Sequence, residues 1–494
     1  MKILLLYPQY PTTFWSFKYA LPFVGKKAAF PPLGLLTVAS MMPSDWEKKV
    51  VDMNVSKLKD EDIKWADFVF ISAMIIQRES VEEIIKRCQK LKVKTVAGGP
   101  LFTTGYEEFK GRIDHFILNE AEETFPLFLA DLEKGQLKNI YTSSRFPDIS
   151  KTPVPMWNLI DFKPYSSMNI QFSRGCPFNC EFCDIVIMNG RVPRIKSKEQ
   201  VIKELDVLYD RGWRGNVFFV DDNFIGNKGA LKKEILPAII SWMEERDYPF
   251  HFNTEASINL ADDEELMKLL AEAGFNTVFI GIETPDEDSL KECGKLHNIN
   301  RNLLDSIRKI QNYGLQVQAG FIVGFDNDTL SIFERQINFI QRSGIVTAMV
   351  GILGALPKTR LYQRLKKEGR LLKDPSGDNT DHSINFMPKM GRISLMDGYK
   401  RILTTIYSPK NYYERVETFL KNYRPLNKKK WSFNMSDFNA FIKSIWLLGI
   451  KGKERYFYWK ILFKSLFTRP HLFPLTVTLS IYGFHFRKVA ESYT

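Results

Sequence analysis

The chain has 494 residues, which is too long for one compact core and predicts two or three domains. Its composition, 44% hydrophobic and 26% charged, is typical of a globular protein. Its longest apolar runs are strand-length, and the N-terminal apolar run breaks at Pro8, so we expect neither a membrane-spanning helix nor a signal peptide, and a cytoplasmic location. Five cysteines exclude a disulfide scaffold. The net charge is +12, of which the segment from Lys421 to Thr494 supplies +11.

The first 140 residues alternate β-rich runs with helical stretches, which predicts an open, doubly wound parallel sheet. The expected strands are Ile3 to Tyr7, Lys49 to Asp52, Phe68 to Ser72, Thr95 to Ala97 and His115 to Leu118. The expected helices are Leu33 to Met42, Ser80 to Leu91 and Glu120 to Leu132. Residues 141–165 are rich in Pro and Ser and are predicted to be a linker.

Six further strand and helix units follow, which predicts a full or partial TIM-type barrel, (β/α)6, over residues 166–385. The expected strands are Asn169 to Ser173, Val217 to Val220, His251 to Glu255, Thr277 to Ile282, Gln316 to Val323 and Thr347 to Leu353. The expected helices are Lys198 to Arg211, Gly229 to Glu245, Asp262 to Ala273, Arg301 to Tyr313, Leu330 to Arg342 and Arg360 to Glu368. Residues 386–494 are predicted to be mainly helical, beginning with amphipathic helices at Ser394 to Tyr407 and Asn411 to Lys421.

The motif with the clearest chemistry is a cysteine cluster on a loop at the carboxyl end of the first barrel strand. It reads Cys176-Pro177-Phe178-Asn179-Cys180-Glu181-Phe182-Cys183. Three thiolates at this spacing hold three irons of a 4Fe-4S cluster and leave the fourth iron open, as catalytic metal sites do. The alternatives are a zinc knuckle, which lacks a fourth ligand at finger spacing, and three buried cysteines. Cys88 and Cys293 are interpreted as inert thiols.

This spacing resembles the radical S-adenosylmethionine (SAM) superfamily, whose open iron binds SAM. Three later segments resemble that family's strand-end motifs: Val220-Asp221-Asp222-Asn223-Phe224, Gly281-Ile282-Glu283-Thr284 and Gly320-Phe321-Ile322-Val323-Gly324. The resemblance implies SAM contacts from Phe182, Asp221, Glu255, Gly281, Glu283, Ile322 and Gly324. Taken singly, the carboxylates have a structural alternative as turn or cap residues. One departure is Lys358, which stands where relatives often have glycine.

The N-terminal domain resembles the cobalamin-binding domain that precedes the barrel in class B radical SAM proteins. The matching segments are Pro31-Pro32-Leu33-Gly34-Leu35, Asp52-Met53-Asn54, Ser72-Ala73, Gly98-Gly99-Pro100 and Asn119-Glu120-Ala121-Glu122. Ser72, Gly98, Gly99 and Glu120 are therefore expected to contact cobalamin. A nucleotide, flavin or purely structural domain is the alternative, although no Gly-x-Gly-x-x-Gly follows the first strand. The Asp-x-His-x-x-Gly motif is missing, so we expect a cobalt whose lower face is not bound by histidine, near Ile75, Ile76 or Gln77.

The C-terminal region resembles the extension found in hopanoid C-methylases and their relatives, on segments such as Tyr412-Tyr413-Glu414-Arg415-Val416 and Tyr482-Gly483-Phe484-His485-Phe486. Between them, Asn427-Lys428-Lys429-Lys430 is strongly basic, and Trp446 to Phe467 mixes aromatic and basic residues. A helix there would suit a membrane interface. Binding of single-stranded nucleic acid or an ordinary basic face over an aromatic core are the alternatives, and nucleic acid is disfavoured.

Together these resemblances predict a radical SAM, cobalamin-dependent methyltransferase. In that family one SAM methylates cobalamin, and a radical from a second SAM abstracts hydrogen from an unactivated substrate carbon, which takes the methyl group. We expect a hopanoid-like lipid or a peptide as substrate and a low-potential electron donor as partner. A cobalamin-dependent radical cyclase or rearrangement enzyme is the alternative. A methylthiotransferase, a cysteine-methylating RNA enzyme and a cobalamin sensor that binds nucleic acid are disfavoured.

Overall fold

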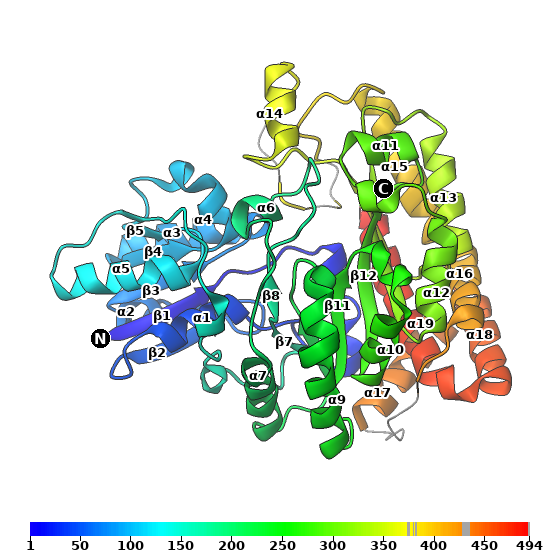
Figure 1. The fold of residues 1–494 in the computed structure, drawn as a ribbon, viewed down its shortest axis with the longest axis horizontal. Helices are drawn as coiled ribbons and strands as arrows, with labels where there is room; N and C mark the ends of the chain where they lie inside the picture. The colour runs from blue at the N-terminus through cyan, green and yellow to red at the C-terminus, as the bar shows by residue number, and fades with distance from the viewer. Residues whose placement is uncertain (373–375, 379, 381–382, 427–434, 493–494) are drawn as a thin grey trace.

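Two six-stranded parallel sheets form the centre of the computed structural model, which describes residues 1–372, 376–378, 380, 383–426 and 435–492. The N-terminal sheet lies on one side of the molecule, the second sheet in the middle, and the C-terminal helices on the other side (Figure 1). This confirms the predicted fold class: a doubly wound domain, a (β/α)6 partial barrel and a helical extension.

The N-terminal sheet has the strand order β2-β1-β3-β4-β5-β6, and every neighbouring pair is parallel. Its strands are β1 Lys2–Tyr7, β2 Glu47–Asp52, β3 Phe68–Ser72, β4 Lys94–Gly98, β5 His115–Ile117 and β6 Ile140–Tyr141. Its helices are α1 Leu33–Met41, α2 Asp60–Trp65, α3 Arg78–Leu91, α4 Pro100–Gly105 and α5 Ala121–Glu133. The near-continuous apolar runs of β1 and β3 are buried, as expected for strands that have helices on both faces.

The second sheet has the order β14-β13-β12-β11-β10-β7, is parallel throughout and stays open between β7 and β14. Its strands are β7 Ser167–Ile170, β10 Asn216–Phe219, β11 His251–Ala256, β12 Phe275–Glu283, β13 Gln316–Val323 and β14 Ala348–Ile352. The helices around it are α7 Lys198–Asp210, α8 Lys228–Ala230, α9 Leu236–Glu245, α10 Glu264–Glu272, α11 Glu287–Glu292, α12 Leu303–Asn312, α13 Ile332–Ser343 and α14 Arg360–Lys367. Beside the sheet, β8 Ser173–Arg174 pairs antiparallel with β9 Arg194–Ile195, and α6 spans Ile185–Met188.

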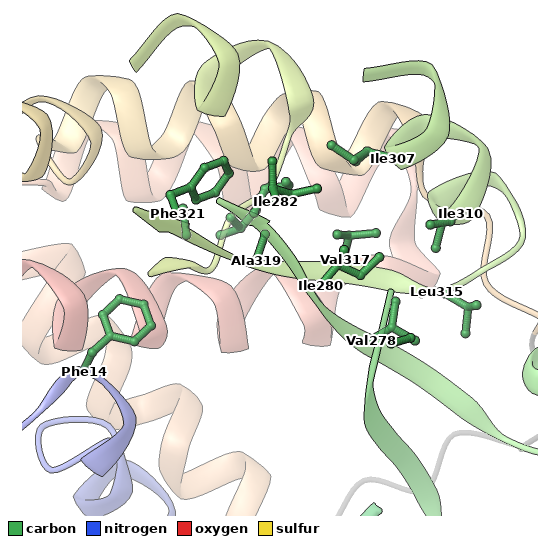
Figure 2. Close-up of a cluster of buried hydrophobic side chains, with 14 of the residues drawn as sticks. Phe14, Val278, Ile280, Ile282, Ile307, Ile310, Leu315, Val317, Ala319 and Phe321 are labelled. Atoms are coloured by element: carbon green, nitrogen blue, oxygen red, sulfur yellow. The ribbon is translucent and has the colours of Figure 1, made fainter. Parts of the chain in front are cut away.

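The core between this sheet and its helices is aliphatic. Alternate residues of β12 and β13, among them Ile280 and Val317, are buried against Ile307 and Ile310 of α12 (Figure 2). The segment that follows β1 also joins this core, because the ring of Phe14 stacks on Phe486 at a centroid distance of 4.2 Å. The first domain therefore sends a loop beneath the second sheet as far as the C-terminal helices.

The C-terminal helices are α15 Arg392–Ile406, α16 Pro409–Asn422, α17 Met435–Ser444, α18 Arg455–Thr468 and α19 Phe473–Ser492, and a π-helical turn, η11 Ile445–Ile450, continues α17. The prediction of one helix from Trp446 to Phe467 is wrong, because the chain turns at residues 451–454, between η11 and α18. The basic run Asn427-Lys428-Lys429-Lys430 lies outside the described residues. None of the helices within the described ranges has the length and apolarity that a membrane span requires.

The predicted linker is less loose than its composition implies. It contains β6 and the fully buried Trp157, and the hydroxyl of Tyr165 donates a hydrogen bond of 2.9 Å to Asp52 in the first domain. Other short elements that the sequence analysis missed are α2 and α4. The domain limits at 140, 165 and 385 stay predictions.

Candidate functional site

The three motif cysteines lie on the loop between β8 and α6, at the carboxyl edge of the second sheet. The loop begins at Gly175, whose φ is +99°, and a Cβ atom there would lie 2.9–3.1 Å from the carbonyl oxygens of Val192, Asn189 and Gly190. The amide of Cys176 donates to the carbonyl of Gly190 at 3.2 Å. A glycine is therefore required for the chain to close so tightly before the first cysteine.

Two neighbouring carboxylates after β10 hold the base of this loop. Asp221 accepts hydrogen bonds from the amides of Phe172 and Ser173 and from the Ser173 hydroxyl. Asp222 accepts from the amide of Gly175 at 2.8 Å and from the side chain of Asn189 at 3.0 Å. Burial raises the pKa of Asp221 to about 7. The sequence analysis expected Asp221 to contact SAM, whereas its carboxylate is directed at the cysteine loop.

The far side of the loop is held by α14 and by the chain around Cys293. Glu181, between the second and third cysteines, accepts two hydrogen bonds from Arg364, at 2.8 and 3.1 Å. Its amide donates to the carbonyl of Cys293 at 2.8 Å. The fold thus brings Cys293, 110 residues away in sequence, next to the motif; its own sulfur donates to the Leu290 carbonyl. Sequence reasoning missed Arg364, because nothing in the spacing of α14 indicates its partner.

A buried ion pair lies beside the cysteines. Lys295 binds Glu283 at 2.7 Å, and both side chains are largely buried. Glu283 has a φ of +64°, where the register of β12 against β13 shifts. A Cβ atom on Gly281 would lie 2.3 Å from the Glu283 carboxylate and 2.6 Å from the Lys295 ammonium. Glycine at 281 therefore leaves the space that this pair occupies.

The positive charge of Lys295 acts on all three motif cysteines. Burial raises the pKa of the Cys176, Cys180 and Cys183 thiols, and the positive charge of Lys295 opposes that rise at each of them. Thiolates are the form that binds iron, and a neighbouring cation stabilises them. The sequence analysis missed Lys295, since a single lysine after Cys293-Gly294 carries no pattern of its own.

The remaining SAM-contact predictions lie along the same edge. Glu255 ends β11 half-buried, and burial near Asp222 and Asp221 raises its pKa to about 8. Ile322 is half-buried near the end of β13, and Gly324, with a φ of +106°, donates its amide to Asp328 at 2.8 Å. The ring of Phe182 packs against the ring of Phe325, the residue after Gly324, and the distance between the two ring centroids is 6.3 Å. The structure therefore gathers these residues around the cysteine loop.

The predicted cobalamin edge consists of small residues in close contact. A Cβ atom on Gly98 would lie 2.9 Å from the carbonyl oxygen of Ile117, and one on Gly99 would lie 2.8 Å from the Ser72 hydroxyl. Gly99 also has a φ of +91°. Larger side chains are therefore excluded at both positions, because neighbouring protein atoms already occupy the place of a Cβ atom.

Gln77, one of the three residues expected near the lower face of cobalamin, is bound within its own domain. Its side-chain amide donates to the Pro8 carbonyl at 2.6 Å, its side-chain oxygen accepts from the Met74 amide at 2.8 Å, and the residue is buried. Both ends of the side chain are therefore used within the domain. Ile75 and Ile76 are half-buried, and Gly377 packs directly against Ile75.

Glu120, which is predicted to contact cobalamin, joins the two domains. Its carboxylate binds Arg174, two residues before Cys176, at 2.7 Å and Arg194 at 2.7 Å, while Glu122 binds Arg174 at 2.8 Å. All four side chains are at most 17% exposed. We call these four residues the interdomain ion cluster. They connect the carboxyl end of β5 to the strands on either side of the cysteine loop.

These residues fit an iron–sulfur cluster and a corrin in their donor chemistry. The three thiols share one short loop and one cation, although in the described part of the chain no three Cys, His, Asp or Glu side chains already converge as a metal site. Ser72 and Gly99 lie on the domain that the interdomain ion cluster connects to that loop.

Comparison with protein families divides the chain into three parts. Residues 27–129 match the B12 binding domain, residues 170–340 the radical SAM superfamily, and residues 359–494 a domain of unknown function, DUF4070. These matches imply cobalamin, a 4Fe-4S cluster and SAM, as predicted.

Two curated relatives cover almost the whole chain. An uncharacterized methyltransferase of Synechocystis is 42% identical over 99% of this chain and 92% of its own length. The hopanoid C-2 methylase of Rhodopseudomonas palustris is 34% identical over 94% of this chain and 89% of its own length.

Solved structures support the fold. TsrM from Kitasatospora setae, a radical SAM methyltransferase with cobalamin and a [4Fe-4S] cluster bound, has a TM-score of 0.65 at 14% identity, with 99% of each chain covered. The cobalamin-dependent radical enzyme OxsB, with aqua-cobalamin and SAM bound, has a TM-score of 0.61 at 14% identity and covers 100% of this chain and 79% of its own.

Proposed function

Because this chain belongs to the B12-binding radical SAM methyltransferase family, we propose that it methylates an unactivated carbon of a hopanoid-like polycyclic lipid. The observation that carries this proposal is the 34% identity to a hopanoid C-2 methylase along nearly the full length of both chains. The enzyme is a cobalamin-dependent radical SAM methyltransferase. The cyclase alternative is set aside, because both full-length relatives bear methyltransferase or methylase names.

One part of the inward face of the second sheet is apolar, which supports a lipid substrate. The strand register places four half-buried apolar side chains on the same face of the sheet: Phe218, Phe279, Ile322 and Met349. The loop after β1 adds Trp15, whose ring lies 5.4 Å from Phe279 and whose indole nitrogen donates to the Met349 sulfur at 2.9 Å. The same face also carries the polar residues Asn253, Glu255 and Gln318. The apolar part would stabilise a polycyclic hydrocarbon by burial, and the polar residues could bind the polar groups of a ligand.

We propose that Cys176, Cys180 and Cys183 hold the cluster and that Phe182, Glu255, Glu283, Ile322 and Gly324 surround SAM, with Ser72, Gly98 and Gly99 under cobalamin. When bound, the cluster and SAM supply a radical that abstracts hydrogen from carbon, and cobalamin supplies the methyl group. Asp222 positions the cysteine loop through the amide of Gly175, and Asp221 holds the segment just before the loop through the amides of Phe172 and Ser173. Gly281 leaves the space for the Glu283 and Lys295 pair.

Two protonation states follow from the geometry. Burial lowers the pKa of Lys295, but the Glu283 carboxylate and the neighbouring cysteines raise it further, so Lys295 stays charged and offsets part of the negative charge of the thiolates. Glu255, with a pKa of about 8, is mainly protonated at neutral pH. A protonated carboxyl both donates and accepts a hydrogen bond, which suits it to a neutral hydroxyl of a bound ligand.

The rest of the assignment is also a proposal. We infer domain limits near residues 140, 165 and 385, a low-potential electron donor, and a cytoplasmic enzyme that acts at the inner face of the membrane. An open-site cluster needs an external one-electron reductant because no described side chain supplies one.

A competition between substrate classes tests the function. The full-length protein would be reconstituted without oxygen and given cobalamin, reductant and SAM with a deuterated methyl group, plus a pentacyclic triterpene in detergent or a tryptic peptide mixture. We expect mass spectrometry to find the labelled methyl group on the triterpene and none with Cys176→Ala. Label in peptides only, or SAM cleavage without any methylated triterpene, would contradict the lipid assignment.

A further inference from the structure

Exposed hydrophobic side chains are concentrated on one part of the surface. Of the twenty large hydrophobic residues that are exposed within the described ranges, nine lie between residues 435 and 467. They are Met435, Phe438, Ile442, Trp446, Ile450, Tyr456, Phe463, Leu466 and Phe467. A soluble surface normally scatters such residues singly, and a concentration of them marks an interaction site.

Helical spacing arranges most of these residues in two stripes. Met435, Ile442, Trp446 and Ile450 follow one another by seven and then four residues along α17 and η11, opposite the buried Ala440, Ser444 and Leu448. On α18, Tyr456, Phe463 and Phe467 have the same spacing, opposite the buried Tyr458, Ile461, Leu462 and Ser465. Each helix therefore packs one face inward and presents a second apolar face outward.

Basic residues surround the stripes. Lys451, Lys453, Arg455, Lys460 and Lys464 are exposed on or next to α18. The ammonium of Lys451 lies 4.7 Å from the Trp446 ring, and Arg455 and Lys460 line an open hollow with Tyr456 and Trp459. In the described part of the chain Lys453, Arg455 and Lys460 form no ion pair with a carboxylate. These cations are available to an anionic partner.

We propose that the surface formed by α17, η11 and α18 is a docking face for an anionic phospholipid bilayer. Aromatic and aliphatic side chains enter the interface while lysine and arginine contact the headgroups. A nucleic acid would bind the basic side chains of this surface, and a folded protein would cover the apolar ones. An anionic bilayer binds both kinds, because its acyl region takes up apolar side chains and its headgroups attract basic ones. The proposed contact is peripheral, and none of the described helices is long and apolar enough to span a membrane.

The docking face lies at the opposite end of the second sheet from the cysteine loop, as the labels of α17 and α18 against those of α6 and α14 show (Figure 1). It is also fixed to the N-terminal domain, because Lys443 donates to the carbonyl of Pro22 at 2.8 Å. Docking there holds the enzyme at the membrane and leaves the cluster edge free. This inference is independent of the substrate.

Vesicle flotation of the full-length protein tests the proposal without SAM or reductant. We expect binding to phosphatidylcholine vesicles that contain phosphatidylglycerol, and at least tenfold weaker binding to pure phosphatidylcholine. The variant Trp446→Gln/Phe463→Gln/Phe467→Gln is expected to lose at least tenfold in affinity. The variant Lys453→Glu/Arg455→Glu/Lys460→Glu is expected to lose binding to the anionic vesicles. Binding of the wild-type protein is expected to be stronger at low salt than at high salt.

Matched controls remove equal numbers of exposed residues elsewhere: Val192→Gln/Leu296→Gln/Leu330→Gln for the apolar set and Lys57→Glu/Lys86→Glu/Lys134→Glu for the charges. Both controls should bind like wild type. The proposal is overturned if wild type does not float, if the controls weaken binding as much as the test variants, or if the apolar variant only dissociates a dimer. Binding to an oligonucleotide and not to vesicles would overturn it as well.

Discussion

The two facing edges of the molecule are built on different principles. The barrel edge is polar and crowded: each residue that flanks the cysteine loop holds or is held by another side chain, as in the pairs Glu181 with Arg364 and Glu283 with Lys295. The predicted cobalamin edge consists of close backbone contacts, because the protein atoms around Gly98 and Gly99 leave no room for a Cβ atom. One edge therefore depends on charge partners and the other on tight backbone packing, and substitutions should affect them differently.

The largest expected effect separates the three motif cysteines from the fourth cysteine that the fold brings near them. Cys176→Ala, Cys180→Ala and Cys183→Ala are each expected to lose the cluster's iron and all detectable cleavage of SAM, since a cubane with two protein ligands is not retained. Cys293→Ala should keep both, because its sulfur is directed at the Leu290 carbonyl. Iron analysis and assay of 5′-deoxyadenosine check this. Loss of iron in Cys293→Ala would show that it is a ligand.

The second effect concerns the interdomain ion cluster. Glu120→Gln leaves Arg174 and Arg194 with a weaker partner in a largely buried place, which is expected to cost about 3 kcal/mol in the free energy of unfolding. We also expect SAM cleavage to continue with less methyl transfer per cleavage, because the two cofactor edges lose their alignment.

Glu265→Gln, which removes the exposed partner of Lys232, is the matched control and should cost less than about 1 kcal/mol. Denaturant unfolding gives the stability, and the ratio of methylated product to 5′-deoxyadenosine gives the coupling. If Glu120→Gln is destabilised but keeps the wild-type ratio of methylated product to 5′-deoxyadenosine, the interdomain ion cluster has only a structural role.

A third effect tests the importance of space at the cobalamin edge. Gly99→Ala places a methyl group 2.8 Å from the Ser72 hydroxyl at a positive φ, so we expect a loss of about 3 kcal/mol and weaker cobalamin binding. Gly111→Ala also has a positive φ but meets nothing within 4 Å, and should cost about 1 kcal/mol. Equilibrium dialysis with cobalamin and denaturant unfolding compare them. Equal losses would mean that backbone strain alone matters at Gly99.

The smallest effect is at Lys358, which has a φ of +69° and donates to the Thr103 carbonyl of the first domain at 3.0 Å. Lys358→Ala keeps the strain and loses this hydrogen bond, so it should cost about 0.5–1 kcal/mol. Lys358→Gly loses the strain too and should be close to wild type, because the relief offsets the lost bond. Thermal unfolding distinguishes them. A Gly variant less stable than the Ala variant would contradict this account of the departure.

The sequence predicted those features that depend on local pattern. Strand ends in both sheets were found within two or three residues, because apolar runs bounded by Gly, Pro and Asp mark buried parallel strands. The cysteine spacing and the strand-end motifs pointed to the edge where the structure gathers them. Short elements such as α2 and β6 were missed, since they are too short to show a period.

Contacts between distant segments could not be predicted. Nothing in Asn119-Glu120-Ala121-Glu122 shows that its carboxylates bind Arg174 and Arg194. The sequence therefore predicted only a contact between Glu120 and cobalamin. Lys295 reaches the cysteines only because the fold returns the chain after β12 to the loop. The break at residues 451–454 had a signal in the sequence that was overlooked, because Gly449 precedes it and Gly452 lies within it.

The central claim is that these two edges serve one methyl-transfer reaction. The most direct test is anaerobic: the reconstituted protein, with cluster and cobalamin quantified, receives SAM and a low-potential reductant, and mass spectrometry follows 5′-deoxyadenosine and S-adenosylhomocysteine. The account predicts both products from wild type, with both lost in Cys176→Ala. Neither product from protein that holds a 4Fe-4S cluster would contradict it, as would 5′-deoxyadenosine without S-adenosylhomocysteine in the presence of cobalamin.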